Sequence, residues 1–396
     1  MANSLGGYSL IQFAQEAIEN LESQLGIAGR IHRGYDKEPQ EKGDVIQISK
    51  PGTFTAQDAP SPAQDVDTSK VNIRLTEWKD VVFKMTDKEL DASMETIVEN
   101  HIRPATYALA LYADQVLAAY FKRFPWRYSM TADQLENILG PQEILAQNGV
   151  PVDDGMVHFG ASNRQYKQFL GQPWMYGGDV RGNTSTLTTG VAQDTFGMKI
   201  HRVGAGVVQT HTSGTVVSAG NDFEGALNGA AAKGATNINI DGLSGAETLA
   251  SGDSFVIAGH TQRYTVTAAI LLAGGAAANV SIYPALATDY ADDSLVTFED
   301  GSQAANHADR NEQNLVYHRH AMALATAALQ GERSTQQARS QGIEVETITD
   351  PDTQLALRAM QWYEAKEKSY YVSLDILFGY EILDPNKAVL AYRDIA

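Results

Sequence analysis

Apolar residues recur at helical spacing near the start of the chain. Between residues 8 and 25 they stand three or four positions apart, which predicts an amphipathic helix with one apolar stripe. Gly26 follows and is expected to end the helix. The stripe comprises Leu10, Phe13, Ala14, Ala17, Ile18, Leu21 and Leu25.

Two apolar stretches then enclose a long polar segment. Residues 45–48 and 71–75 have the composition of strands, and residues 81–83 offer a continuation of the second one. The segment between them is about 20 residues long and rich in Pro, Asp and Ser, and compact domains rarely hold such a loop without a purpose. Two interpretations stay open: a disordered loop, or the tip of a hairpin arm that becomes ordered against a neighbouring subunit.

A long helix is expected next. Thr86 and Glu89 fit a capping box, in which the hydroxyl and the carboxylate satisfy the first free N–H groups of a helix. Apolar residues continue at helical spacing to Phe121, for about 35 residues or roughly 50 Å. Pro104 lacks an N–H donor, so a kink or a break is expected near Arg103.

The remaining parts of the chain contain both helices and strands. Helices are predicted at 131–148, at 164–170 with Ser162 or Asn163 as the cap, and at 354–367, and strands at 157–159, 315–317 and from 370 to about 390.

A change in composition marks residues 213–300. This stretch has no Met and no Trp, and one Lys and one Arg against ten Asp and Glu give it a net charge of −8. Short strands at roughly ten-residue spacing predict an inserted all-β domain, a small sandwich or barrel. The strand candidates are 215–217, 238–240, 254–258, 263–267, 280–283 and 295–298.

Composition narrows the class of protein. The 396 residues include 30 Lys and Arg against 48 Asp and Glu, a net charge of −18, which argues against a large interface with nucleic acid. The absence of cysteine excludes disulfides, thiolate catalysis and Cys-ligated metals, and it suits a reducing cytoplasm. The start has no secretory signal, and the longest apolar run, 268–278, is too short to span a bilayer.

Motifs for catalysis or cofactor binding are not convincing. Residues 204–209 lack the third glycine of a dinucleotide loop, and 237–242 lack the final acid of a calcium loop and are better explained as a strand and a turn. His318 and His320 have no third ligand in suitable context, and the acids between 344 and 352 fit a solvated or inter-subunit surface better than an acid–base pair. We therefore expect no catalytic, cofactor or metal site, and no enzyme.

Five segments carry a resemblance to one family. Residues 75–90 (LTEWKDVVFKMTDKEL) resemble the junction of E-loop and spine helix in the major capsid proteins of tailed phages. Residues 159–167 resemble the strand-then-helix signature of their axial domain, 314–325 the segment after the insertion, and 374–389 the closing strand pair. Residues 249–259 are similar to the first strand of the inserted barrel in coat proteins of short-tailed enterobacterial phages.

The resemblance implies an α+β chain with the Hong Kong 97-like fold. The expected parts are an N-terminal arm (1–35), an E-loop hairpin (36–80), a peripheral domain with the spine helix (81–128 and 368–396), an axial domain (129–212 and 301–367) and the inserted β domain (213–300). The residues expected to contact neighbouring subunits are Leu10, Phe13, Ile18, Leu21, Lys50, Pro51, Phe54 and Lys70.

The implied function is that of a major capsid protein in a virion, assembled in the cytoplasm of a host bacterium. Copies of the chain would form pentamers and hexamers of an icosahedral shell around double-stranded DNA, with a portal and with no membrane. Because no scaffolding segment is visible before residue 8, a separate scaffolding protein is expected. Lys50 and Lys70 flank the hairpin tip, but no motif identifies a cross-linking partner. The alternatives are the shell of a protein nanocompartment and a cytoplasmic enzyme with an accessory β domain.

Overall fold

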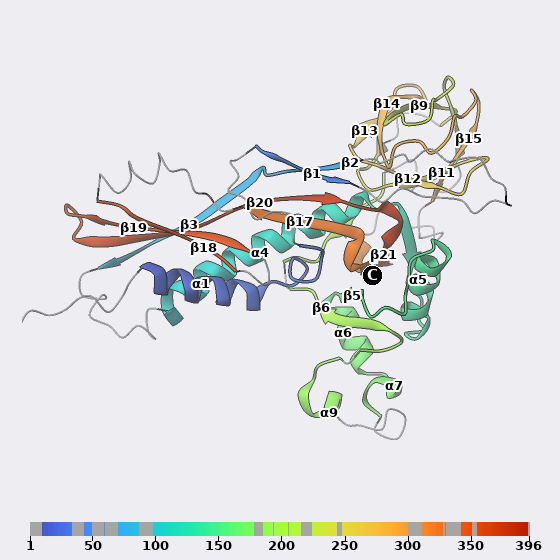
Figure 1. Cartoon of the computed structure of the whole chain (residues 1–396). Helices are drawn as coiled ribbons and strands as arrows, with labels where there is room; N and C mark the ends of the chain where they lie inside the picture. Colours follow the sequence, from blue (N-terminus) through green and yellow to red (C-terminus); the bar gives the residue numbers. More distant parts are fainter. Residues whose placement is uncertain are drawn as a thin grey trace, which may run out of the picture. The chain divides into compact units, whose positions relative to one another are not determined.

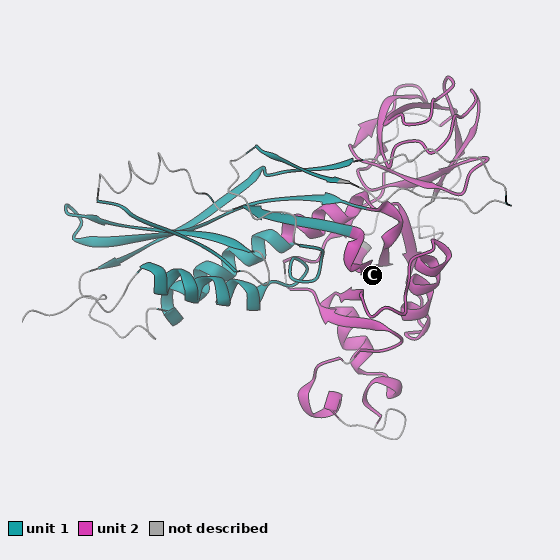
Figure 2. Ribbon diagram, in the orientation of Figure 1, with its two compact units in different colours: residues 1–114, 322–383 teal, residues 115–321, 384–396 magenta. Residues whose placement is uncertain are grey.

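The computed structural model describes residues 10–33, 43–49, 59, 70–86, 98–177, 185–192, 194–204, 206–214, 224–243, 248–299, 311–327, 329, 342–350 and 355–394. These residues form two compact units, coloured separately in Figure 2. Unit 1 comprises residues 1–114 and 322–383, and unit 2 comprises residues 115–321 and 384–396.

Unit 1 is built on an antiparallel sheet around one long strand, β20 (Ser369–Ile382). On one side, β20 pairs with β3 (Glu77–Thr86) over ten residue pairs. On the other side, the first half of β20 pairs with β19 (Ala356–Glu364) and its second half with β17 (Met322–Ala327), and β18 (Glu344–Thr349) pairs with β19. The predicted helix at 354–367 is therefore wrong, because this segment hydrogen-bonds to strands along both edges.

Two helices lie against one face of this sheet. Helix α1 (Leu10–Gln24) packs on β18 and β19, and its predicted apolar stripe is buried. The π-helical turn η1 (Val98–Ile102) leads into α4 (Arg103–Tyr120), so the break expected near Arg103 is confirmed. Pro104 stands in the first turn of α4, where its missing N–H costs no helical hydrogen bond. Residues 87–97, with most of the capping box, lie outside the described residues.

The predicted hairpin is confirmed at its base, where β1 (Val45–Ser49) pairs antiparallel with β2 (Lys70–Arg74). It lies on the face of the sheet opposite to α1 and α4 (Figure 1). Ile46 and Ile73 pack there on the small side chains of β17 and on Leu377. Gly379 makes this approach possible, because a Cβ at this position would stand 2.2 Å from the carbonyl oxygen of Arg74.

One carboxylate fixes the turn that follows α1. The Asp114 side chain, buried on α4, accepts hydrogen bonds from the N–H groups of Gly26 at 2.8 Å and of Ala28 at 2.9 Å. Burial raises the pKa of Asp114, although these N–H groups and Arg30 act in the opposite direction. Gly26 is needed here for space, because an added Cβ would lie 2.7 Å from Asp114 Oδ2.

Unit 2 contains a sheet in the order β4-β21-β16-β5-β6, with β7 also paired to β16. Helices α5, α6, α7 and α9 complete this part of the unit. The strands are β4 (Trp126–Ser129), β5 (Val157–Ala161), β6 (Met198–Arg202), β7 (Thr210–His211), β16 (Asn311–His318) and β21 (Ala388–Asp394); the helices are α5 (Glu136–Gln147), α6 (Asn163–Leu170), α7 (Pro173–Tyr176) and α9 (Ser185–Thr189). Short 3₁₀ turns are η2 (Phe121–Arg123), η3 (Arg319–Ala321) and η4 (Pro385–Lys387).

Buried polar side chains join the sheet of unit 2 to its helices. Ser162 caps α6 by accepting a hydrogen bond from the Gln165 N–H at 3.2 Å, which decides between the two predicted caps. The Ser162 N–H in turn donates to Asn314 Oδ1 on β16 at 2.7 Å. Gln165 donates to Gln134 at 2.8 Å, so each buried group of this set has a partner.

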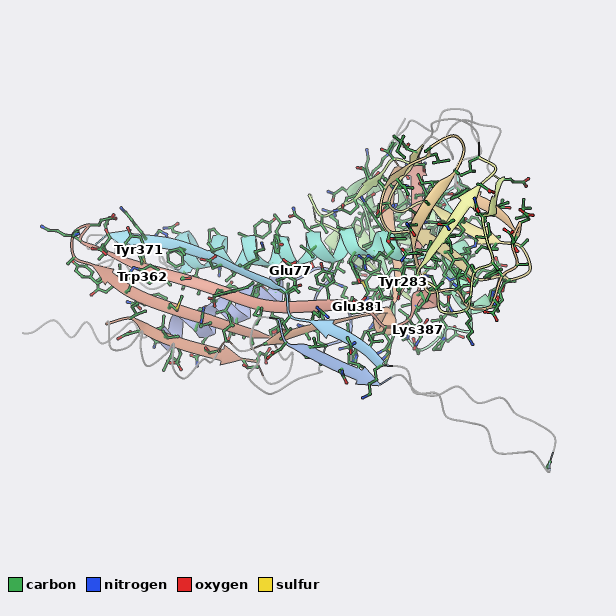
Figure 3. All side chains as sticks on the ribbon, turned by 90° about the horizontal axis from the view of Figure 1, so that it is seen from above. Glu77, Tyr283, Trp362, Tyr371, Glu381 and Lys387 are labelled. Atoms are coloured by element: carbon green, nitrogen blue, oxygen red, sulfur yellow. The ribbon has the colours of Figure 1, made fainter. Side chains whose placement is uncertain are left out.

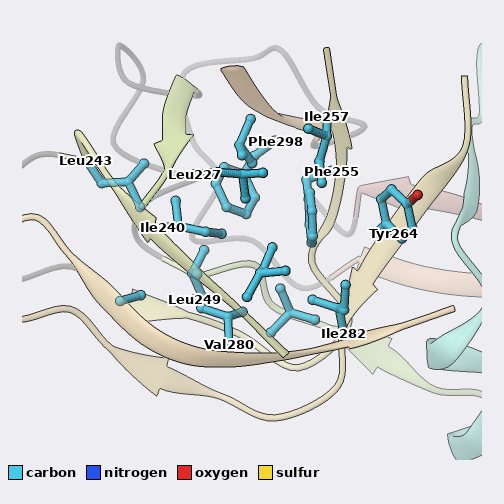
Figure 4. Close-up of a cluster of buried hydrophobic side chains, with 14 of the residues drawn as sticks. Leu227, Ile240, Leu243, Leu249, Phe255, Ile257, Tyr264, Val280, Ile282 and Phe298 are labelled. Carbon is cyan, nitrogen blue, oxygen red and sulfur yellow. The ribbon is translucent and has the colours of Figure 1, made fainter. Parts of the chain in front are cut away.

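Residues 224–299 form a closed six-stranded barrel within unit 2, in the order β11-β12-β14-β9-β8-β15. Its core of aliphatic and aromatic side chains is drawn in Figure 4. The barrel strands are β8 (Glu224–Leu227), β9 (Asn237–Asp241), β11 (Ser254–Ile257), β12 (Arg263–Val266), β14 (Ala277–Tyr283) and β15 (Leu295–Glu299); β10 (Thr248–Leu249) and β13 (Ile270–Leu271) form a separate pair.

The strands predicted from residue 238 to residue 298 are thus confirmed, β8 was missed, and 215–217 lies outside the described residues.

A buried carboxylate ties the barrel to its neighbouring segment. Asp253 accepts hydrogen bonds from the N–H groups of Ala250 at 2.7 Å and Gly214 at 3.1 Å, and lies 3.1 Å from His211 Nε2. Arg127 also donates to the carbonyl of Gly252 at 2.6 Å. These contacts hold the turn that leads into β11.

Candidate assembly surface

A broad face of the unit 1 sheet is left uncovered by the described residues. We call it the outer face and define it by Trp78 and Val82 on β3, Met360 and Trp362 on β19, and Tyr371 on β20. The strand register places their side chains on one side of the sheet, opposite to α1 and α4. Trp78 is 45% exposed and Val82 is 47% exposed. Figure 3 looks down on this face.

The hairpin covers only the far end of the same face. It packs where β17 and the second half of β20 run side by side, on alanines and on Leu377. Beyond that point no described element lies over β3, β20 and β19. Exposed large apolar side chains on one sheet face are typical of a surface that binds another protein.

An ion pair lies beneath Trp78. The Arg358 guanidinium pairs with the buried carboxylate of Asp375, with its Nε at 3.0 Å from Oδ1. The Trp78 indole N–H donates to the other oxygen of Asp375 at 3.3 Å, and Arg358 lies 5.7 Å from the indole ring. Burial raises the pKa of Asp375, and Arg358 opposes that rise. Because the Asp375 carboxylate binds both Arg358 and the Trp78 indole N–H, this arrangement orients Trp78.

Aromatic rings and charges mark the other end of the outer face. Trp362 and Tyr371 come from neighbouring strands and stack with ring centroids 5.4 Å apart (Figure 3). Lys84 pairs with Glu367 at 3.3 Å, and both side chains are half exposed. Glu367 also accepts a hydrogen bond from the Tyr371 hydroxyl. An apolar centre with a polar border is the usual composition of a protein–protein interface.

The predicted contact residues of the N-terminal helix lie elsewhere. Leu10, Phe13, Ile18 and Leu21 are buried within unit 1, since the stripe of α1 packs against β18 and β19 of its own chain. Their side chains form part of the core of this subunit, and their role in subunit contacts stays a prediction. Sequence periodicity predicted the apolar stripe correctly, but it could not show whether the same chain or a neighbouring subunit covers the stripe.

The predicted contact residues of the hairpin are described in part. Lys70 is exposed at the start of β2 and donates to Gln47 at 3.4 Å. Lys50, Pro51 and Phe54 lie outside the described residues. The role of all four in subunit contacts stays a prediction.

A second exposed apolar group lies in unit 2, around α7 and α9. Leu187 is 68% exposed, and Tyr176, Val191 and Phe196 also expose much of their side chains. The Phe196 ring is 6.4 Å from that of Trp174.

The described residues hold no group of three or more His, Asp or Glu side chains that fits a metal ion. His318 ends β16 and contacts Asp154 at 2.8 Å, and His320 lies in the following turn. Residues 237–242 form β9 and a turn at Gly242, as predicted. Among the helices described, none has the length and apolar character to cross a bilayer.

Trp78 and Val82 were missed as site residues by sequence reasoning. Both lie in the segment that carries the resemblance, and their four-residue separation places them on one face of a strand. That signal was present, but the pairing of β3 along β20, which exposes this face, is not readable from local sequence.

Comparisons with known proteins gave matches among solved structures only. No family model and no curated protein matches the chain. A chain of Mycobacterium phage Che8 is 13% identical, with 93% of this chain and 90% of that chain covered and a TM-score of 0.44.

Two further solved structures resemble the chain to about the same degree. A chain in the asymmetric unit of the bacteriophage PhiM1 mature capsid is 11% identical, with 93% and 87% covered and a TM-score of 0.44. A virus-like particle from Pyrococcus furiosus is 5% identical, with 96% and 98% covered and a TM-score of 0.41. These scores describe a loose likeness of fold without residue-level correspondence.

Proposed function

We propose that this chain is the shell-forming subunit of a tailed-phage capsid. The observation that carries the proposal is the outer face, where Trp78 and Val82 are exposed on a sheet that the chain itself covers only at one end. A stable monomer rarely leaves such a face to water. The segments that resemble phage capsid proteins, and the paired strands β1 and β2 that lie on the same face, support the same function.

The proposed mechanism is assembly through interfaces. The outer face of one subunit receives an apolar surface of a neighbour, and burial of that apolar area drives association. The hairpin tip between residues 50 and 69 binds a neighbouring subunit. Pentamers and hexamers formed in this way close into an icosahedral shell.

The charge of the chain fits the proposed content of the shell. A net charge of −18 gives the subunit little affinity for phosphate, so double-stranded DNA is enclosed without being bound tightly. A separate scaffolding protein and a portal complete the proposed set of partners. The proposed location is the virion, after assembly in a bacterial cytoplasm.

Electron microscopy of the purified chain tests this function directly. The expected result is closed particles in negative stain, either from the chain alone or after co-expression with a scaffold. Monomers or small oligomers under every assembly condition would overturn the proposal. The content of the particles separates the two shell functions: a nanocompartment holds a co-purifying protein cargo, whereas a capsid made in infected cells holds DNA and a portal.

A further inference from the structure

We propose that β3 pairs edge to edge with β3 of a second copy of this chain, antiparallel and centred on Val82, about a local two-fold axis. The proposal rests on the self-assembly proposed above and names one of its contacts. Among the described residues, β3 pairs with β20 alone, over its whole length of ten residues. Between Lys79 and Met85 its other edge therefore offers backbone N–H and C=O groups for a further strand.

The outer-face side chains of β3 are complementary to themselves in this register. An antiparallel strand centred on Val82 places Val82 opposite its own copy, and Asp80 opposite Lys84 of the other copy. The two-fold axis repeats the Asp80–Lys84 pair on both sides of the centre. Opposite charges and apolar pairs directly across a strand pair are the stabilising combinations.

The side chains on the other face of β3 agree with the same register. Val81 falls opposite Phe83 of the other copy, twice, so the centre is apolar on both faces of the joined sheet. In registers shifted by two residues, Val81 no longer lies opposite Phe83 of the other copy. Centring on Asp80 brings two carboxylates together, and centring on Lys84 brings two ammonium groups together, which is unfavourable.

β3 is held rigidly for such a contact. On the face toward α4 and η1, the Glu77 carboxylate accepts a hydrogen bond from Tyr112 at 2.8 Å, and Lys79 lies 4.8 Å from the Tyr112 ring. The Phe83 ring stacks on His101 at 5.6 Å. The strand therefore loses little freedom on pairing, which favours association. Lys84 already forms a half-exposed ion pair with Glu367. Because exposed ion pairs are weak, Lys84 can also bind Asp80 of the other copy with little loss of stability.

Single cysteines test the register, because the chain contains no cysteine of its own. In the V82C variant the two new side chains face each other at about 5 Å between Cβ atoms, and mild oxidation is expected to give a covalent dimer. In D80C alone and K84C alone the equivalent residues of the two copies stand about 13 Å apart, so neither is expected to cross-link. A mixture of D80C with K84C is expected to cross-link.

Exchanging the charges of Asp80 and Lys84 provides a second, independent test of the register. In the V82C background, D80K and K84D each place like charges opposite each other and are expected to slow cross-linking at least about fivefold at low salt. The double variant D80K/K84D restores the opposite charges and is expected to restore the rate. The cysteine-free D80K/K84D chain serves as the control for folding, by circular dichroism.

The outcomes separate this contact from the proposed function. Closed particles in which V82C stays reduced under oxidation would overturn the β3 contact and leave the shell function standing. Covalent V82C dimers in a chain that never forms particles would support the contact and overturn the shell function. Cross-linking of V82C to V45C on the hairpin, in place of V82C to itself, would show that the hairpin of a neighbour occupies the edge and would overturn the proposal.

Discussion

The buried Asp114 side chain on α4 accepts hydrogen bonds from two backbone N–H groups in the turn after α1. Residues 26 and 114 are far apart in sequence, so Gly26 could be predicted as a helix terminator, but not as a site of close approach. Glycine patterns indicate where a chain turns, whereas glycine is needed at this position because a Cβ would stand 2.7 Å from the Asp114 carboxylate. The same limit applies to Gly379, whose need for space arises from the hairpin.

Replacement of Asp114 by asparagine is expected to lower the free energy of unfolding of unit 1 by about 1–3 kcal/mol. The amide has one acceptor oxygen, so it can satisfy only one of the two N–H groups and turns an N–H group toward the other. Urea unfolding followed by the fluorescence of Trp78 and Trp362 measures the change. The control is E99Q, which removes a half-exposed surface charge paired with Arg103 and is expected to change stability by less than about 0.5 kcal/mol. Equal effects of the two variants would contradict the role given to Asp114.

His320 is expected to make unit 2 less stable as the pH falls from 7.5 to 5.5. Burial, His318, Lys387 and Arg319 lower its pKa below the ordinary value of 6.5. Below that value the unfolded chain binds a proton that the folded chain does not, so stability decreases with falling pH. Asp154 contributes only at lower pH: burial acts to raise its pKa, but the hydrogen bonds from His318 and from the Met156 N–H lower it overall, so its contribution is lost in acid.

Urea unfolding at pH 7.5, 6.5 and 5.5, followed by Trp126 and Trp174, measures this dependence. In H320Q the decrease over this range is expected to become smaller, because glutamine does not titrate. An unchanged pH profile in H320Q would exclude His320 as its source.

The elements of the chain were predictable where local pattern and tertiary pairing agree. The amphipathic stripe of α1 and the alternating strands of the barrel follow from spacing alone, and Ser162 was one of two predicted caps. The segment 356–364 is different: Ala, Leu, Met, Gln and Glu favour helix locally, yet the segment pairs with β18 on one edge and β20 on the other. Two ladders of hydrogen bonds outweigh the weak helical preference of single residues.

The hairpin at β1 and β2 is expected to depend on Gly379. A G379A variant places a methyl group against the backbone carbonyl of Arg74, and overpacking of this kind costs typically about 1–3 kcal/mol. Hydrogen exchange at Ile46 and Ile73 is expected to accelerate while the amides of β19 keep their protection. G171A is the matched control, since a Cβ there meets its nearest atoms at 3.6 Å. Unchanged protection at Ile46 and Ile73 would show that the hairpin does not need this close approach.

At the scale of the whole chain, the sequence indicated an acidic all-β stretch inside a mixed chain, and a closed barrel is present there. The candidate site was predicted less well. The resemblance led us to expect subunit contacts from residues in the stripe of α1, which is buried in this chain, and it did not indicate the exposed face of β3, β20 and β19. β3 and β20 lie about 300 positions apart in the sequence, as in the pairing of Glu77 with Phe378, so only the fold reveals the surface.

Deletion of residues 52–68 tests the proposed role of the hairpin tip in the assembled shell. The base of the hairpin is paired within the chain, so the subunit is expected to fold, while the particles lose subunit ties and dissociate at lower urea concentration or temperature. Light scattering during heating measures this loss, with circular dichroism of the subunit as the control. Particles as stable as those of the full chain would contradict the role of the tip.

The position of β20 and β21 after the barrel in the sequence has a consequence for folding during synthesis. β20 is the central strand of one sheet, and β21 lies between β4 and β16 in the other. All six barrel strands lie before residue 300, so the barrel can close while the chain is still being translated, whereas both sheets need β20 or β21, which are made later. A chain that stops before residue 369 therefore lacks the central strand of the outer face.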